Sequence, residues 1–590
     1  MNTDKQECTP QATYFAEMVA RHASLQGDTV FLELLRALVQ SSDEGNSALD
    51  VRNWESPCRE EALKRLEGRH SAWSCAVAED GCEDMLHPLV WVSSTGCLYL
   101  LKNRLAEKQI AAYVASSLAR NAEVAGEARI VKTLQRLLAA EETVAGLSTN
   151  LSSEDARDQR RAVASSFGRA ISMITGGPGT GKTTTLGAVL ALEIQKNPDI
   201  RIALAAPTGK AAAQMGTAIR EQLDNSGLAC NLENADMIRG KLGELRPVTI
   251  HKLLGINPQR MGLPRFHHKY TLPYDLVIVD ESSMVSLLLF RQLVNAIPED
   301  GRLMLLGDKD QLASVEPGAV FGDLAEILLK AEPSCYTWLR INFRSREIQE
   351  LVGFASNIAE GRIDLAKEKA AGLYNEPEES KFLARELPAR GEWEDALRAI
   401  KNQWNLKCPR NGTPEELLAF HESFKILCAV HQGPCGTEAL NQLAAKTLGI
   451  GNGADGMPVL VTKNDPLTGL SNGNVGVWKD GKVWFRIQKK GTESSVVKGF
   501  AQAELPGCEP AFAITIHKSQ GSSYDNVLVI LPDSENQILS RNLVYTAVTR
   551  ARKRCLIWGA KESILAALDA EARRVTGLPE CAKEMEKGGN

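Results

Sequence analysis

The stretch Gly176-Gly177-Pro178-Gly179-Thr180-Gly181-Lys182-Thr183-Thr184 decides how this chain folds. It fits the pattern G-x-x-x-x-G-K-[ST] without departure. An apolar run, residues 170–174, precedes it, and a helix-compatible run, residues 183–195, follows it. This order predicts a buried strand, a glycine loop and a helix N-terminus. Such a loop binds phosphates because its backbone N–H groups and the helix dipole attract anions.

The residue types of this loop suit ATP. We expect Lys182 to reach the β- and γ-phosphates, and the Thr183 hydroxyl to bind Mg²⁺. The rest of the loop is predicted to line the nucleotide site: Gly176, Gly177, Pro178, Gly179, Thr180, Gly181 and Thr184. A simple glycine turn is the alternative, and the flanking strand and helix argue against it.

Length and composition indicate a large globular protein. A chain of 590 residues is too long for one hydrophobic core, so several domains are expected. The 68 basic and 73 acidic residues give a net charge of −5. Bulk charge therefore does not indicate a nucleic-acid binder, although a basic groove between domains is compatible with it.

Cysteine usage and apolar runs predict the compartment. The 13 cysteines are scattered and form no C-x-x-C pair, which favours reduced thiols in a cytoplasmic protein. The first residues lack a signal-peptide pattern, and no apolar run approaches the roughly 18 residues of a membrane span. We therefore expect no membrane association.

The order of apolar runs predicts an α/β fold. Near-continuous apolar runs alternate with helical stretches, as in parallel sheets covered on both faces. The runs form two series, which predict two α/β domains: 171–175, 202–206, 276–280 and 303–307, then 425–430, 527–531 and 555–559. The second series is interrupted by short alternating segments with Asn-Gly and Asp-Gly turns, which predict a small β-barrel.

These patterns give the following domain organisation. We expect a mostly helical N-terminal domain over 1–115 and a helical connector over 116–150. The first α/β domain is predicted over 151–335, and the second over 336–590 with the β-barrel near 459–510. Residues 584–590 are predicted to be a disordered tail.

Two further segments suit phosphate chemistry. Residues 276–281 form an apolar strand that ends in Asp280 and Glu281. Asp280 is expected to hold Mg²⁺, and Glu281 to act as the general base on the attacking water. Gln311 follows the strand that ends at Gly307, where it could sense the γ-phosphate or orient water.

Seven segments, in this order, resemble the motifs of superfamily 1 DNA helicases. Their spelling is similar to the RecD branch, the alpha subunit of exodeoxyribonuclease V, and the resemblance covers about residues 155–560. The segments are GGPGTGKTT (176–184), APTGKAA (206–212), VDESSM (279–284), LGDKDQLASVEPG (306–318), NFR (342–344), AITIHKSQGSSYD (513–525) and LVYTAVTRAR (543–552).

The resemblance implies roles for further residues of the ATP site. Gln159 matches the family glutamine that contacts adenine, whose edge an amide can both donate to and accept from. Arg344 and Arg550 match two arginines that reach the γ-phosphate across the cleft between the domains. The family tyrosine before the first of these arginines is Phe343 here, which keeps an aromatic ring but loses a hydroxyl.

The resemblance also implies a track for single-stranded DNA. The track residues are Thr208, Lys210, His251, Asn472, Thr515, His517, Lys518 and Gln520. Asn472 fits the family pattern less closely than the others, and a single histidine such as His251 is often only a packing residue. Contacts to the DNA backbone would make binding tolerant of sequence and sensitive to salt.

Residues 264–270 hold a second family feature and a possible metal pair. Relatives carry a strand-separating pin in this interval. His267 and His268 could instead bind a metal, but no third ligand lies nearby in the sequence. No cluster of Asp, Glu and Lys outside the ATP motifs suggests a nuclease, so we expect nuclease activity only in a partner subunit.

The resemblance implies an ATP-dependent 5′→3′ DNA helicase that uses ATP and Mg²⁺. It implies that the two α/β domains are RecA-like P-loop motor domains, the first with a small hairpin insertion near 256–273. It further implies a heterotrimer with RecB-like and RecC-like subunits that acts on duplex DNA ends in double-strand break repair. Two alternatives are a stand-alone RecD-like helicase and a nucleotide-gated subunit that does not itself unwind DNA. Glu281 and both arginines are present, which argues against an inactive motor.

Overall fold

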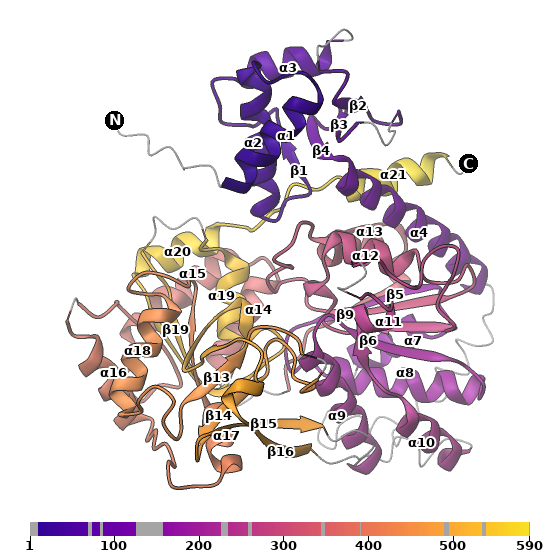
Figure 1. Ribbon diagram of the computed structural model, residues 1–590. Helices are drawn as coiled ribbons and strands as arrows, with labels where there is room; N and C mark the ends of the chain where they lie inside the picture. Colours follow the sequence, from indigo (N-terminus) through magenta and orange to yellow (C-terminus); the bar gives the residue numbers. More distant parts are fainter. Residues whose placement is uncertain are drawn as a thin grey trace.

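The computed structural model describes residues 10–68, 73–82, 87–125, 157–225, 234–257, 262–343, 348–389, 391–465, 467–488, 495–533 and 538–588. Two helix-covered parallel sheets lie side by side, and a smaller domain sits above them in Figure 1. The predicted α/β class with two motor domains is confirmed.

The first parallel sheet has the strand order β10-β5-β9-β8-β6-β7. Its side chains alternate between two apolar cores, one on each face. Helices α7, α8, α9 and α10 cover one face, and α4, α11, α12 and α13 cover the other. The bounds are β5 Ile171–Gly176, β6 Ile202–Ala206, β7 Val248–Thr249, β8 Leu276–Val279, β9 Arg302–Gly307, β10 Tyr336–Leu339, α4 Leu101–Ala125, α7 Arg157–Ser166, α8 Lys182–Lys196, α9 Gly209–Asn225, α10 Ala235–Glu244, α11 Ile250–Leu253, α12 Leu287–Val294 and α13 Val320–Ala331.

The second parallel sheet has the order β11-β20-β19-β12-β18. Helices α14, α15, α19 and α20 pack on one face, and α16 and α18 on the other. The bounds are β11 Phe382–Arg385, β12 Phe424–Cys428, β18 Ala513–Thr515, β19 Tyr524–Ile530, β20 Ala551–Trp558, α14 Gln349–Ala359, α15 Ile363–Gly372, α16 Trp393–Gln403, α17 Pro414–Ser423, α18 Thr437–Leu448, α19 Arg541–Val548 and α20 Lys561–Asp569.

An antiparallel sheet interrupts the second motor domain. Its order is β16-β15-β14-β13-β17, and its strands are β13 Pro458–Val461, β14 Val475–Lys479, β15 Lys482–Gln488, β16 Ser495–Phe500 and β17 Cys508–Pro510. Asp480 and Gly481, at φ 51° and 71°, make the tight turn between β14 and β15. Among the described residues the edge strands β16 and β17 do not pair, so these five strands form a sheet with two edges.

The N-terminal domain contains helices α1 Pro10–His22, α2 Thr29–Asp43 and α3 Arg59–Glu67. A four-stranded sheet of order β1-β4-β3-β2 packs with them: β1 Ala48–Asp50, β2 Val77–Glu79, β3 Leu89–Val92 and β4 Cys97–Leu100. Helix α4 begins directly after β4, and its residues Ala106, Ile110 and Val114 enter the core of the first motor domain. The helix therefore crosses the boundary predicted at residue 115 and joins the two domains.

The C-terminal residues return to the first motor domain. We call residues 570–588 the C-terminal strap; it ends in α21, Leu578–Gly588. Helix α21 lies along α4 and contacts α13 (Figure 1). Its side chains Leu578 and Cys581 are buried in the core of the first sheet. The structure thus places residues 584–588 in a helix, where the sequence predicted a disordered tail.

The strap meets the N-terminal domain at a buried polar junction. Glu107 accepts hydrogen bonds from the Ser47 hydroxyl at 2.5 Å and from the Gly577 N–H at 3.0 Å. The Thr576 hydroxyl donates to Asp323 on α13 at 3.0 Å. Burial raises the pKa of Glu107, and it raises that of Asp323 to about 7. Two buried carboxylates, Glu107 and Asp323, therefore hold the strap against the N-terminal domain and the first motor domain.

Two further expectations can be compared with the described residues. The cysteines there are all free thiols. Within the same residues, no helix combines the length and apolar character that a bilayer span requires.

Candidate active site

The phosphate loop lies at the carboxyl end of β5. Gly179 and Gly181 have φ values of 82° and 86°, which a residue with a Cβ rarely adopts. Gly181 is also the N-cap of α8 and offers no side chain to cap the first turn. Those N–H groups are therefore available to an anion. The Lys182 ammonium bonds the carbonyls of Gly176 at 2.5 Å and Gly177 at 3.1 Å, so it lies over the loop.

Gln159 and Phe343 approach the loop from two different segments. The Gln159 side chain is buried, and its Nε2 would lie 2.8 Å from a Cβ built on Gly181. Its Oε1 is buried without a hydrogen-bond partner. Phe343 donates its N–H to the Gly179 carbonyl at 2.9 Å. Gln159, expected to contact adenine, and Phe343 thus come together beside the loop, whereas Arg344 lies outside the described residues.

Two carboxylates follow β8, next to the loop. Asp280 accepts from the Glu281 N–H at 2.8 Å, and Glu281 has a left-handed φ of 52°. Burial, and then the charge of Glu281, raise the pKa of Asp280 to about 6, and the nearby Lys182 opposes this shift. Crowded carboxylates with little compensating charge suit a divalent cation, so Asp280 with the Thr183 hydroxyl fits Mg²⁺.

Residues 308–312, called the sensor loop below, follow β9. Asp308 and Gln311 are buried, and the Gln311 Nε2 donates to Asp308 Oδ2 at 2.8 Å. The other amide atom, Gln311 Oε1, is buried without a partner. Its orientation is therefore fixed, and one acceptor is left for a ligand or water.

Arg550 comes from the second motor domain. It is 2% exposed, and its guanidinium donates to the carbonyls of Thr546 at 3.0 Å and Ser522 at 3.1 Å. Its Nη2 is buried without a partner. Burial lowers the pKa of Arg550, while the charges of Glu281 and Asp308 raise it. A Cβ built on Gly521, next to Ser522, would lie 4.0 Å from Glu281 Oε1, so Arg550 is held where the second motor domain approaches this carboxylate of the first.

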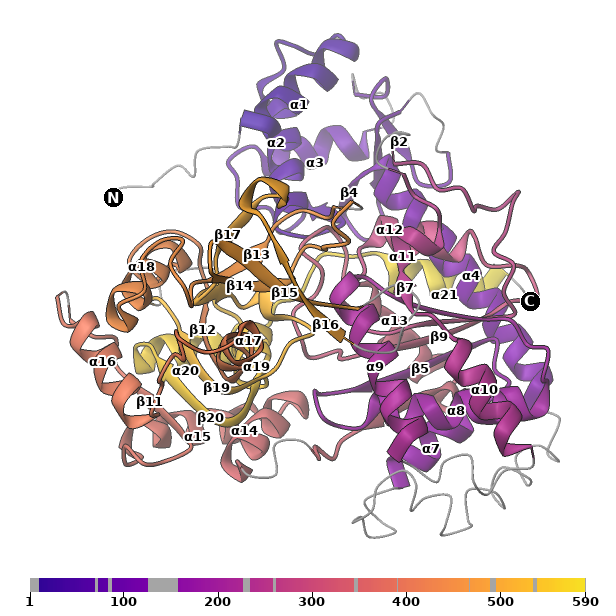
Figure 2. The same cartoon turned by 60° about the horizontal axis from the view of Figure 1, so that its bottom comes forward.

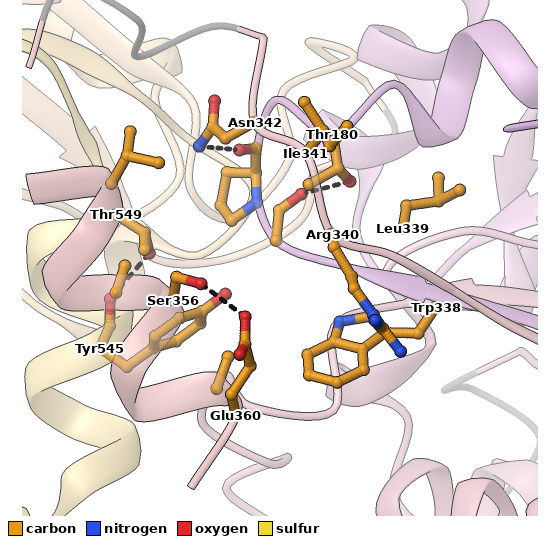
Figure 3. Close-up of a pocket in the computed structure, with 15 residues that line it drawn as sticks. Thr180, Trp338, Leu339, Arg340, Ile341, Asn342, Ser356, Glu360, Tyr545 and Thr549 are labelled. Atoms are coloured by element: carbon orange, nitrogen blue, oxygen red, sulfur yellow. Dashed lines mark hydrogen bonds between the residues drawn. The ribbon is translucent and has the colours of Figure 1, made fainter. Parts of the chain in front are cut away.

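A cavity of about 200 Å³ lies between the two motor domains (Figure 3). The start of the phosphate loop, the segment after β10 and helices α14 and α19 line it. Asn342 ties this segment to the loop by donating to the Pro178 carbonyl at 2.9 Å. A ligand bound in this region would touch both sheets.

Most residues of the expected DNA track are accessible. His251, Asn472 and Lys518 are exposed, and Thr208, Thr515 and His517 are partly buried. The Thr208 hydroxyl accepts the Ala211 N–H at 3.2 Å at the start of α9, and Lys518 pairs with Glu509 at 2.6 Å. Burial, and then Arg574, lower the pKa of His517.

Two residues of the expected track are engaged inside the protein instead. Lys210 donates to the Ser522 hydroxyl at 2.5 Å, and burial lowers the pKa of Lys210 to about 8. Gln520 is 9% exposed and donates to the Leu312 carbonyl at 2.7 Å. Both contacts join the first motor domain to the second. These two side chains therefore stabilise the observed arrangement of the two domains.

Sequence reasoning missed three side chains of α19. Asn542, Tyr545 and Thr546 contact the sensor loop of the first motor domain. Their spacing of three and four residues puts them on one helix face. Polar residues recurring at that spacing in an otherwise apolar helix were the available signal.

The segment 264–270 is compact and rich in rings. Phe266 and Tyr270 stack with centroids 5.2 Å apart, and the Arg265 guanidinium lies over both rings. The rings of His267 and His268 are tilted at 5.5 Å. No group of three or more metal-ligating side chains exists among the described residues.

Comparisons with known proteins agree with this geometry. Residues 159–317 match the AAA domain family, and residues 510–558 match the UvrD-like helicase C-terminal domain. The RecBCD enzyme subunit RecD of Mycobacterium tuberculosis is 36% identical over 437 residues, covering 71% of this chain and 72% of that protein. The Haemophilus influenzae RecBCD subunit RecD is 30% identical over 488 residues, covering 72% of each chain.

Two other similar proteins are helicases. The ATP-dependent RecD2 DNA helicase of Deinococcus radiodurans is 29% identical over 432 residues, covering 70% of this chain and 50% of that protein. A solved structure of a Bacteroides Pif1 helicase with ADP-AlF3 and ssDNA is 18% identical, with a TM-score of 0.38, over 71% of this chain and 95% of that one.

A phosphate loop, an acidic strand end and an arginine from the second motor domain define a P-loop motor of the superfamily 1 helicase class. Within that class, the chain belongs to the RecD family.

Proposed function

We propose that this chain is an ATP-dependent DNA helicase that moves 5′→3′ along single-stranded DNA. Membership of the RecD family supports the activity, and the resemblance of the motifs implies the direction. The observation that carries the proposal is the position of Arg550, which is buried and bound to the Ser522 carbonyl where the second motor domain approaches Glu281 of the first. A site that needs both domains links ATP hydrolysis to their relative movement.

The residues of the site divide the chemistry among them. Lys182 and the N–H groups of the phosphate loop hold the phosphates, and Gln159 contacts the adenine. Asp280 and Thr183 would hold Mg²⁺, which supplies positive charge to the phosphates when bound. Glu281 takes a proton from the attacking water, and Gln311 orients that water.

Charge on the transferred phosphoryl group is stabilised from the second domain. The arginines that supply this charge are Arg550 and Arg344. The Nη2 of Arg550 is buried and has no hydrogen-bond partner, so no solvent has to be removed from it before it meets a phosphate. Hydrolysis removes the γ-phosphate that these groups bind from both domains. The cleft between the motor domains can then open.

Accessible polar side chains provide the DNA track. We assign Thr208, His251, Asn472, Thr515, His517 and Lys518 to it. Lys210 and Gln520 join the track when the cleft opens and their contacts to Ser522 and Leu312 are released. The aromatic segment 264–270 acts as the pin that separates the strands. Affinity then falls as salt rises, because backbone phosphates carry the binding.

The partners follow from family membership. We propose that the chain works in the cytoplasm in a heterotrimer with RecB-like and RecC-like subunits. The complex acts on duplex DNA ends in double-strand break repair, and its nuclease lies in a partner. The alignments support a subunit over a stand-alone helicase, because they span 72% of the RecD subunits but 50% of RecD2. Residues 1–115 dock the partners.

ATP hydrolysis and unwinding by wild type and Lys182→Gln test the proposal. We expect strong stimulation of hydrolysis by single-stranded DNA, its loss in the variant, and unwinding only from a 5′ tail. Lys196→Gln, at the far end of α8, is the matched control and should behave as wild type. Hydrolysis without DNA stimulation, or no unwinding with partner subunits present, would favour a nucleotide-gated structural subunit instead.

A further inference from the structure

One face of α19 binds the sensor loop of the other motor domain. Asn542 donates to the Asp310 carbonyl at 2.9 Å, and the Thr546 hydroxyl accepts the Leu312 N–H at 2.9 Å. Between them in the chain, the Tyr545 hydroxyl donates to Asp308 Oδ2 at 3.1 Å. The backbone and one side chain of the loop are therefore held from the second domain.

Asp308 Oδ2 accepts two hydrogen bonds, and they come from different domains. Tyr545 donates from the second domain, and Gln311 Nε2 donates from the sensor loop itself at 2.8 Å. Asp308 is 1% exposed, so water is poorly placed to replace a lost donor. The amide nitrogen of Gln311 is hydrogen-bonded to Asp308. The amide oxygen of Gln311 therefore points away from that carboxylate, and it has no hydrogen-bond partner.

The Tyr545 hydroxyl is a hydrogen-bond donor that lies beside the phosphate loop. Burial, and then the charge of Asp308, raise the pKa of Tyr545 well above its usual value, so the hydroxyl keeps its proton. The side chain lines the cavity next to Gly177 and Pro178 (Figure 3). A Cβ added to Gly177 would lie 2.7 Å from the Tyr545 oxygen, and the next atom would be 3.9 Å away.

We propose that Tyr545 is a positioning residue for ATP hydrolysis. Its hydroxyl holds Asp308, Asp308 holds the Gln311 amide nitrogen, and the Gln311 oxygen is thereby aimed at the attacking water. This inference rests on the proposed function. Since Tyr545 belongs to the second motor domain, the water is oriented only while α19 is docked on the sensor loop, and hydrolysis waits for closure of the cleft.

Steady-state hydrolysis by Tyr545→Phe tests this role. The variant keeps the ring and removes only the donor to a charged, buried acceptor, so we expect the DNA-stimulated kcat to fall about ten-fold or more. KM for ATP and the affinity for single-stranded DNA should stay within about two-fold, because neither ground-state complex uses this hydrogen bond. Tyr374→Phe is the control: its hydroxyl donates to the Gly559 carbonyl at 2.6 Å, away from the cleft.

A second comparison tests the geometry itself. In Gly177→Ala the new methyl group collides with the Tyr545 oxygen and displaces it from Asp308. Removing that oxygen in Gly177→Ala/Tyr545→Phe relieves the collision, since the next atom lies 3.9 Å away. The phenylalanine should therefore lower kcat in the wild-type background and leave it unchanged or higher in the alanine background.

The outcomes separate the two proposals. An unchanged kcat in Tyr545→Phe, or a raised KM with unchanged kcat, overturns the positioning role. Equal losses from the phenylalanine in both backgrounds also overturn it. A wild-type protein whose hydrolysis ignores DNA would instead overturn the proposed helicase function, whatever the variants do.

Discussion

At the scale of single residues, the buried amide of Gln159 predicts base selectivity. Its Oε1 has no partner in the protein, so an adenine that donates to this oxygen satisfies a costly buried acceptor. Gln159→Ala should therefore raise KM for ATP about ten-fold and change KM for GTP much less. Hydrolysis assays with both nucleotides measure this. Equal losses for both would mean that the side chain supports the loop and not the base; Gln403→Ala, exposed on α16, is the control.

Sequence predicted the residues of this site to different degrees. Lys182, Asp280 and Glu281 belong to short motifs whose spacing is set by one strand and one loop, so the local pattern was sufficient. Lys210 and Gln520 are different, because their partners Ser522 and Leu312 are 312 and 208 residues away in the chain. No local pattern records such a contact. The roles of all these residues remain proposals.

At the scale of elements, the polar junction under the C-terminal strap predicts a pH effect. Asp323 has a folded pKa of about 7, above the ordinary value of 3.8, because burial and nearby acidic groups such as Glu107 disfavour its charge. A raised carboxyl pKa means that the folded protein binds more protons than the unfolded chain between these two values. The stabilising contribution of Asp323 is therefore complete below about pH 4. It is lost as the pH rises from there through about 7.

Asp323→Asn should remove this contribution to the pH dependence. The asparagine keeps an oxygen to accept from Thr576 but carries no charge. We expect the variant to unfold at a temperature at least about 2 °C higher than wild type at pH 8, and this difference to shrink steadily as the pH falls toward about 4. Thermal unfolding across this range measures the effect. Exposed Asp364→Asn should show no such trend, and a variant less stable than wild type at pH 8 would contradict the assignment.

Whole helices and strands could be predicted where their burial produces a regular pattern of apolar residues in the sequence. The strands of both parallel sheets are covered on two faces, so β5, β8 and β9 appear in the sequence as near-continuous apolar runs. Helix α21 carries several charged residues, and this composition resembles a solvated tail. Only its Leu578 and Cys581 face, packed on α4, makes it part of a core, and the sequence contains no sign of that surface.

At the scale of the whole molecule, the inserted antiparallel sheet touches the first motor domain near the expected DNA track. A Cβ built on Gly209 would lie 2.6 Å from the Ser471 hydroxyl in the loop between β13 and β14. Figure 2 shows this sheet between the two motor domains, with β16 directed toward α9. Thr208 and Asn472, predicted separately as DNA contacts, are sequence neighbours of the two residues that meet here.

Gly209→Ala should therefore press the inserted sheet away from the first motor domain. Overpacking of this kind costs about 1–3 kcal/mol, so we expect affinity for single-stranded DNA to fall about five-fold or more. Ser471→Gly in the same chain removes the colliding atoms and should restore most of the affinity. Fluorescence anisotropy with a labelled oligonucleotide measures both. Failure of the second substitution to rescue the first would place the loss in α9 itself.

Because the C-terminal strap packs on the first sheet, the core of the first motor domain is completed only late in biosynthesis. Ribosomes deliver α4 before most of the first motor domain and all of the second, yet the apolar face of α4 is completed by Leu578 and Cys581, which follow the second motor domain in the chain. A nascent chain therefore carries an unfinished core through the synthesis of the whole second motor domain. Chaperones that shield apolar helices have a long interval in which to act, and a chain truncated before residue 578 never closes that core.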